Sequence, residues 1–326
     1  MEERLKDAFA FLDCQKRIEA TSNHPPVLFH IGLHKTGSTW LQRQFFPSIQ
    51  GAVFKDDFGP THRSFINPGF GKFSLYMVET QLSDLMATSR IRGVPLILSD
   101  EALGGRPFGQ RFYSQIFAFR LKAAFPDARI LIVCREQRAI LGSFYGEYLR
   151  YGHSRSLLQF IQSGGPDSKS EEGSVRDYYR YDQMLDFYRG VFGEKNVVMV
   201  PMEWMLRNPE GMLERLSELL GSELCFVRSP NMQTERPAWS SWAQGIQRLA
   251  NQHLLRDGRM HRELGILKPN ALAYRVDRLT PAWARRRGSQ KRRQLIEMAV
   301  GDRFVASNRR LAESIGFDLG AFGYSV

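Results

Sequence analysis

Residues 30–40, HIGLHKTGSTW, contain the residue types that bind a phosphate or sulfate group. Gly32 and Gly37 stand five positions apart after a short apolar run, and a helix can begin just after Gly37. Such a turn directs backbone N–H groups and the positive end of a helix dipole at one spot, which suits an anion. Three hydroxyl residues add donors: Thr36, Ser38 and Thr39.

Lys35 adds a mobile cation, but it precedes Gly37 by two residues. In a nucleotide triphosphatase the lysine instead follows the second glycine. A plain helix-capping turn with an ordinary exposed lysine is the alternative interpretation of this segment.

A second group of anion-binding residues follows another apolar run, ILIVC, at residues 130–134. Arg135 comes directly after this run, and Ser143 stands eight residues later inside the next predicted helix. An arginine at a strand end can make a forked contact to a phosphate, and the serine can add a hydroxyl. Taken alone, this pair also fits a surface arginine and a serine on a helix face.

Together the two motifs resemble the sulfotransferases that use 3′-phosphoadenosine 5′-phosphosulfate (PAPS) as donor. Six consecutive residues match their 5′-phosphosulfate loop position for position: Lys35, Thr36, Gly37, Ser38, Thr39 and Trp40. Arg135, Ser143 and Tyr145 fit the family's 3′-phosphate motif, although Gln137 stands where many members have proline. In a later segment, residues 197–221, Glu203 matches the family and Met202 stands where the family often has tyrosine. Residues 304–324 are similar to the ending of many bacterial carbohydrate-type members.

The resemblance implies a role for each matching residue. Lys35 would lie beside the oxygen that bridges phosphate and sulfuryl group, and would neutralise the charge that grows there as the bond breaks. Arg135 and Ser143 would hold the 3′-phosphate. Trp40 would stack on adenine, although a tryptophan entering a helix also fits a core position. The implied donor is PAPS, and no metal ion is expected.

Transfer to an alcohol needs a base within hydrogen-bond reach of the acceptor. Asp100 and Glu101 follow a third apolar run, LILS, and carbohydrate sulfotransferases have a glutamate at a comparable position. We expect Glu101 to be the base, with Asp100 second. His34 stands next to the lysine and could help to position the sulfuryl group. The acidic pair also fits a simple helix cap.

Four short apolar runs, VLF at residues 27–29, LIL at 96–98, ILIVC at 130–134 and VVMV at 197–200, alternate with polar turns and amphipathic helices from Val27 onward. This pattern predicts an α/β fold, with a P-loop-like central parallel sheet flanked by helices on both faces, as in sulfotransferases. Ligands of such sheets gather at the carboxyl ends of the strands, where all the motifs above fall. We expect residues 1–26 to be a helical extension and 27–326 to form one domain. Residues 54–73 and 163–174 look irregular, and helices at 174–193 and 239–255 are expected to cover the sheet.

The composition favours a folded protein with an anionic partner. Forty-three per cent of the residues are hydrophobic and the formal charge is +11. Three scattered cysteines fit a reducing compartment, and no apolar run is long enough to span a membrane, so we expect a cytoplasmic protein. The resemblance of its C-terminal segment implies a bacterial one. The cationic segment 285–293 could be a solvated helix face, a lid over the 3′-phosphate, a patch for a charged polysaccharide or lipid acceptor, or a peripheral membrane contact.

The predicted activity is sulfuryl transfer from PAPS to a hydroxyl or amine of a sugar, glycolipid or small-molecule acceptor. A small-molecule kinase that uses ATP and magnesium is the alternative, but it leaves the position of Lys35 and the pairing of Arg135 with Ser143 unexplained. A nucleic-acid-binding protein would explain the charge, but no recognised module supports it, so no nucleic-acid partner is expected.

Overall fold

The computed structural model describes residues 24–55, 58–69, 71–105, 114–162, 178–230, 239–254 and 269–326. Residues 1–23 of the expected N-terminal extension and the irregular segment 163–174 therefore lie outside the described residues. All the predicted site residues lie inside them.

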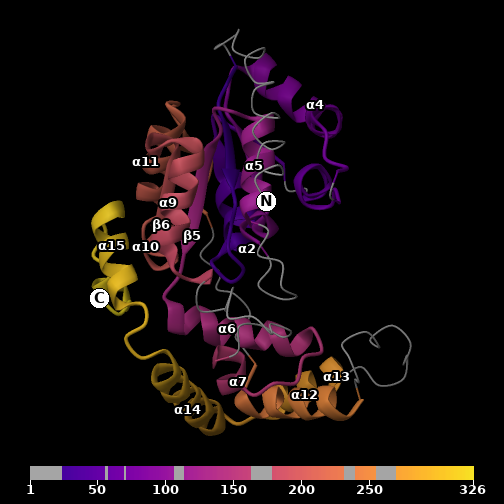
Figure 1. Ribbon diagram of the computed structural model, residues 1–326, viewed down its shortest axis with the longest axis vertical. Coiled ribbons are helices and arrows are strands. Elements are labelled where there is room, and N and C mark those ends of the chain that lie inside the picture. Colours follow the sequence, from indigo (N-terminus) through magenta and orange to yellow (C-terminus); the bar gives the residue numbers. More distant parts are fainter. Residues whose placement is uncertain are drawn as a thin grey trace, which may run out of the picture.

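The centre of the molecule is a five-stranded parallel sheet with the strand order β3-β4-β1-β5-β6 (Figure 1). Its strands are β1 (Val27–His30), β3 (Val53–Phe54), β4 (Leu96–Ser99), β5 (Arg129–Cys134) and β6 (Val197–Pro201). Four of them coincide with the predicted apolar runs, whereas the two-residue edge strand β3 was not predicted. Helices flank the sheet on both faces, so the predicted α/β fold class is confirmed.

Successive side chains of each strand point to opposite faces of the sheet, so the strands contribute to two separate cores. In β1, Phe29 faces one core and Leu28 the other, and in β5 Ile130 and Leu131 divide in the same way. All four side chains are fully buried. Strands buried on both faces read as continuous apolar runs, which is why these segments could be recognised from the sequence.

One face of the sheet packs against α4 (Leu75–Arg92), α5 (Ser114–Ala124) and α9 (Tyr181–Phe192). The other packs against α2 (Ser38–Trp40) and its continuation as a π-helix (Leu41–Phe45), and against α10 (Met202–Arg207) and α11 (Pro209–Leu220). The C-terminal α15 (Val305–Ile315) lies against α9 and β6.

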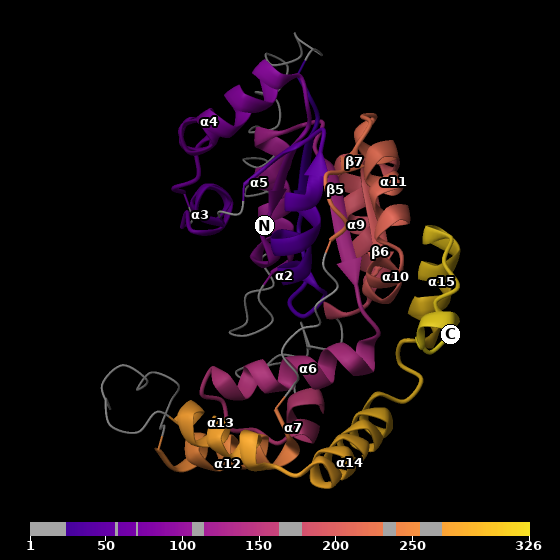
Figure 2. The ribbon, with the colours of Figure 1, turned by 180° about the vertical axis from the view of Figure 1, so that it is seen from behind.

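Helices also form a layer beyond the carboxyl ends of the strands (Figures 1 and 2). It contains α6 (Gln137–Arg150), α7 (Leu157–Gln162), α12 (Ser241–Leu254), α13 (Pro269–Leu279) and α14 (Ala282–Val300). The expectation that the helix at 239–255 covers the sheet is wrong, because α12 packs against α6, α13 and α14 instead. The amphipathic pattern of α12 predicts that its apolar face is covered, but it does not indicate which element covers it.

The remaining elements are short. They are the antiparallel pair β2 (Ile49–Gln50) and β7 (Cys225–Phe226), helix α3 (Phe58–Thr61), a π-helix at His62–Ile66, and 3-10 turns at Phe46–Ser48, Glu101–Gly104, Glu194–Asn196 and Gly320–Phe322.

Candidate active site

The turn from β1 to α2 has the unusual backbone conformation that an anion-binding turn needs. Gly37, which caps α2, has φ 85°, and Lys35 has φ 72°, a left-handed conformation that is costly for a residue with a side chain. Lys35 has the only positive φ of a non-glycine residue within the described chain. Such conformations persist where the surroundings hold them, and they cluster at functional sites.

The turn is in very close contact with the 3-10 helix that follows β4. A methyl group built on Gly104 would lie 2.1 Å from the carbonyl oxygen of Gly32, and one on Gly32 would lie 2.8 Å from Cα of Glu101. Only glycines permit this approach. It brings Glu101 beside the lysine turn.

We therefore expect Gly104→Ala to destabilise the protein by about 3 kcal/mol, because the added methyl group would force two backbone segments apart. Gly190→Ala in α9 is the matched control, since nothing lies within 4 Å of its added methyl group. It should be neutral or stabilising by up to ~1 kcal/mol. Urea unfolding of both variants measures the difference; equal stabilities would show that the turn tolerates displacement.

The ammonium group of Lys35 reaches across to α6, where its Nζ lies 2.6 Å from Oε1 of Glu147. The same carboxylate accepts a hydrogen bond of 2.7 Å from Arg150. Burial raises the pKa of Glu147, but the two cations lower it by more, so the net shift is downward and the carboxylate is ionised at neutral pH.

Glu147 was not predicted as a site residue. A signal for it existed, because it stands four residues after Ser143 and so shares a helix face with it. No sequence pattern, however, indicates that this face meets Lys35.

Arg135 begins the connection from β5 to α6 and lies against the lysine turn. Its Nη1 donates a hydrogen bond of 2.8 Å to the carbonyl of Lys35, and its own carbonyl accepts one of 2.8 Å from the Tyr181 hydroxyl. Its Nε is buried without a hydrogen-bond partner. Buried donors are normally satisfied, so Nε is available to an anion.

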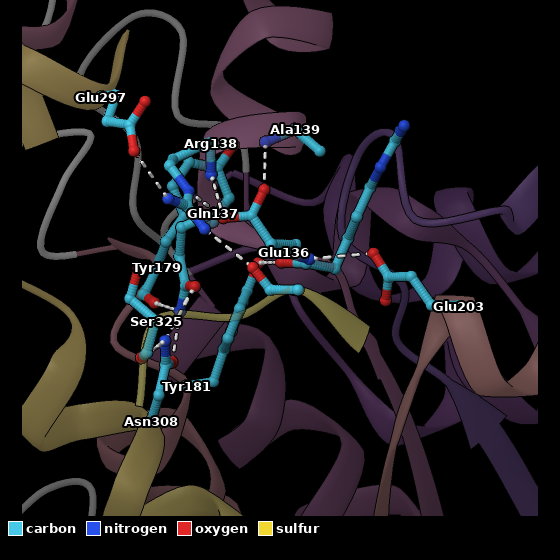
Figure 3. A network of polar contacts seen from close by, with 12 residues as sticks. Glu136, Gln137, Arg138, Ala139, Tyr179, Tyr181, Glu203, Glu297, Asn308 and Ser325 are labelled. Atoms are coloured by element: carbon cyan, nitrogen blue, oxygen red, sulfur yellow. Dashed lines mark hydrogen bonds and ion pairs between the residues drawn. The ribbon is translucent and has the colours of Figure 1, made fainter. Parts of the chain in front are cut away.

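A polar network fixes the first turn of α6 (Figure 3), which Arg135 precedes by two residues. Glu203 accepts from the N–H of Glu136 at 3.1 Å and from the Tyr324 hydroxyl at 3.2 Å, and burial raises its pKa. Gln137, which stands where many of the sulfotransferases that the motif resembles have proline, is buried and exchanges hydrogen bonds with Asn308. Side-chain contacts thus hold this turn without the proline.

The hydroxyl residues of the two motifs differ in their burial and in their hydrogen bonds. Ser38 Oγ is buried without a partner, like Arg135 Nε. Thr36 is fully buried and donates to the carbonyl of Leu33 at 2.6 Å, so its hydroxyl shapes the turn rather than facing a ligand. Thr39 is exposed. Ser143 is half-buried, on the face of α6 that carries Glu147.

Trp40 is 6% exposed and packs against Phe45, with ring centroids 5.2 Å apart. The structure therefore gives it the core position that was the alternative in the sequence. Little of its ring surface is open to a base, and the adenine-stacking role stays a prediction.

The two candidate bases have different surroundings. Asp100 is 3% exposed and uses both oxygens: one caps the 3-10 helix at Ala102 N (2.9 Å) and the other lies 2.9 Å from His62 Nδ1. Glu101 is more exposed, and its Oε1 lies 3.9 Å from Nδ1 of His34, whose ring stacks on Phe144 of α6. This placement favours Glu101 over Asp100, and its role as the base stays a prediction.

His30, at the end of β1, is a neutral buried residue beneath the turn. Its Nδ1 lies 2.7 Å from Ser99 Oγ, and burial lowers its pKa to about 3. The unfolded chain binds a proton near pH 6.5, so stability falls as the pH drops from 6.5 towards 3.

Between pH 7.5 and 5.5, this one residue should cost the protein about 1.4 kcal/mol of stability. His30→Asn cannot titrate, so its loss over the same interval should be smaller than that of the wild type by this amount. Urea unfolding at the two pH values measures it. Identical losses would mean that His30 is protonated equally in both states.

Three features of this site suit a doubly anionic ligand. The Lys35 ammonium, the Arg135 guanidinium with its buried unpartnered Nε, and the buried unpartnered Ser38 hydroxyl meet where β1 and β5, neighbours in the sheet, end. The residues present therefore fit a nucleotide that carries phosphate at two positions. Within the described chain, no three His, Cys, Asp or Glu side chains are grouped so that they could hold a metal ion.

No protein-family model matches the chain, and no curated protein does. Among solved structures, a sulfotransferase from Alicyclobacillus acidocaldarius is similar, with a TM-score of 0.46 and 19% sequence identity. The match covers 65% of this chain and 86% of that one. None of the described helices combines the length and apolar character needed to cross a membrane.

Proposed function

We propose that this protein is a sulfotransferase that takes the sulfuryl group from PAPS and transfers it to a hydroxyl or amine of an acceptor. The observation that carries the proposal is the contact of Arg135 with the Lys35 turn, at 2.8 Å. The two cationic groups come from separate strand ends and were predicted from separate motifs. One adenosine with phosphates on its 5′ and 3′ positions can contact both.

Each residue then has a chemical task. Backbone N–H groups of the turn and the Ser38 hydroxyl would hold the 5′-phosphosulfate, and Arg135 Nε with Ser143 the 3′-phosphate. Lys35 would stabilise the charge that develops on the bridging oxygen. Glu101 would take the acceptor's proton. When bound, PAPS supplies an activated sulfuryl group, so the protein need only position the donor and the acceptor, neutralise the charge on the leaving oxygen and accept the acceptor's proton.

A thermal-shift comparison tests the proposal against the kinase alternative. With EDTA present, adenosine 3′,5′-bisphosphate, the product nucleotide, should raise the melting temperature, because ligands of the native state stabilise it by mass action. ATP with magnesium should raise it less. The reverse order would favour the kinase. Screening sugars, glycolipids and small alcohols with labelled PAPS would then identify the acceptor class.

Glu147 should oppose nucleotide binding, since its negative charge pairs with the cation that the donor needs. Glu147→Gln should therefore bind adenosine 3′,5′-bisphosphate more tightly, by about fivefold for a ~1 kcal/mol repulsion in a partly solvated site. Glu313→Gln, an exposed acid on α15, is the charge-matched control and should change nothing. Weaker binding by Glu147→Gln, measured by calorimetry, would mean that the carboxylate instead holds Lys35 in its binding position.

A further inference from the structure

An exposed aromatic surface lies where the first turns of α12 and α14 meet. Trp242 at the start of α12 and Trp283 at the start of α14 touch edge to face, with ring centroids 6.1 Å apart. They remain 52% and 63% exposed despite this contact. Leu279, the last residue of α13, is 81% exposed, and Leu249 follows Trp242 by two helical turns on the same face of α12. Large apolar groups gathered in this way mark an interaction surface.

The same surface is strongly basic. Along α14, the exposed residues Trp283, Arg286, Arg287 and Lys291 follow at helical spacing and form one stripe. Residues 269–296 contain a single acid, Asp277, which is paired with Arg285 at 3.1 Å. The basic residues in that range are Arg275, Arg278, Arg285, Arg286, Arg287, Lys291, Arg292 and Arg293. The stripe is thus apolar at Trp283, and the basic side chains follow it along α14.

We infer that this surface, defined by Trp242, Leu249, Leu279, Trp283, Arg286, Arg287 and Lys291, binds the protein to the anionic face of a lipid membrane. Tryptophan is favoured at the membrane–water interface, where its ring is apolar and its N–H is hydrated. Each Lys or Arg near an anionic lipid surface adds attraction. Apolar insertion together with cations is the combination by which a protein attaches to a bilayer without crossing it.

Two other occupants fit less well. A second copy joined by a two-fold axis would bring the same cationic stripe against itself, which is repulsive. A nucleic acid would satisfy the cations, but it would leave the exposed aliphatic side chains of Leu249 and Leu279 without an apolar partner. A lid over the nucleotide is also disfavoured, because α14 packs on α6, the helix whose own Glu147 contacts Lys35. The inference does not depend on the proposed function.

Co-sedimentation of the full chain with vesicles tests it. The protein should pellet with vesicles of phosphatidylcholine and phosphatidylglycerol, more weakly at high salt, and not with phosphatidylcholine alone. Arg286→Gln/Arg287→Gln should weaken the binding by about 30-fold. Trp242→Ala/Trp283→Ala should weaken it by about tenfold or more. Arg90→Gln/Arg92→Gln, which removes two exposed cations from the end of α4, is the charge-matched control and should bind like the wild type.

Equal weakening by the control pair would mean that net charge alone attracts the protein, and would overturn the inference. So would a dimer in analytical ultracentrifugation that the tryptophan variant dissociates. Binding to duplex DNA that is as tight as binding to the anionic vesicles, and insensitive to the tryptophan variant, would also overturn it. Thermal melts of the variants, all at exposed positions, show whether each one is folded. Vesicle binding needs no donor or acceptor, so its outcome is separate from that of the sulfotransferase assays.

Discussion

Lys35→Ala should slow sulfuryl transfer by about 100- to 1,000-fold, the usual cost of removing one group that stabilises charge in a transition state. Affinity for adenosine 3′,5′-bisphosphate should fall by a smaller factor, because the oxygen that Lys35 serves stays on the 5′-phosphate of the product, where the backbone N–H groups of the turn and the Ser38 hydroxyl also bind that phosphate. The variant should fold, since Arg150 remains to pair with Glu147 at 2.7 Å. The rate is measured as release of the bisphosphate from PAPS, with the best acceptor from the screen.

The matched control for this prediction is Lys122→Ala, which removes a lysine from α5 that donates to the carbonyl of Pro126. It should leave the transfer rate unchanged. If Lys35→Ala transferred sulfuryl groups at the wild-type rate, the mechanism proposed for Lys35 would be wrong even if the protein is a sulfotransferase.

Arg135→Ala should weaken adenosine 3′,5′-bisphosphate binding by about 100-fold, the value of a charge-assisted, forked contact to phosphate. Adenosine 5′-monophosphate lacks the 3′-phosphate, so its weaker binding should change by only a few-fold. Arg135→Lys should fall between wild type and alanine, because it keeps the charge and loses the fork. Calorimetry with both nucleotides measures the two effects.

The comparison of the two nucleotides separates recognition from structure. Arg135 also holds the carbonyl of Lys35, so the alanine variant could disturb the turn itself. A disturbed turn would weaken both nucleotides equally. Equal losses would therefore contradict the assignment of Arg135 to the 3′-phosphate.

Much of the fold could be predicted because its strands are buried on both faces. β1, β4, β5 and β6 each read as an apolar run closed by a polar turn, and this pattern is local. β3 could not be predicted, since Val53 and Phe54 form a strand only by pairing with β4. The partner of α12 was predicted incorrectly, because helical periodicity specifies an apolar face and not what covers it.

In the site, too, features set by the local sequence pattern could be predicted, whereas contacts set by tertiary packing could not. Lys35 and Arg135 could be predicted as neighbours, because parallel strands bring their carboxyl ends to one edge of the sheet. The contact of Lys35 with Glu147 could not, since it depends on the left-handed backbone at Lys35 and on the orientation of α6. The directions of the Thr36 hydroxyl and the Trp40 ring likewise depend on tertiary packing.

The central claim is that one nucleotide touches both cationic groups, and a crystal structure with adenosine 3′,5′-bisphosphate tests it most directly. We expect the 5′-phosphate to lie against the backbone N–H groups of residues 35–38 and the 3′-phosphate to bind the Arg135 guanidinium. A nucleotide bound in the turn with its 3′-phosphate in solvent, or bound elsewhere on the protein, would contradict the account.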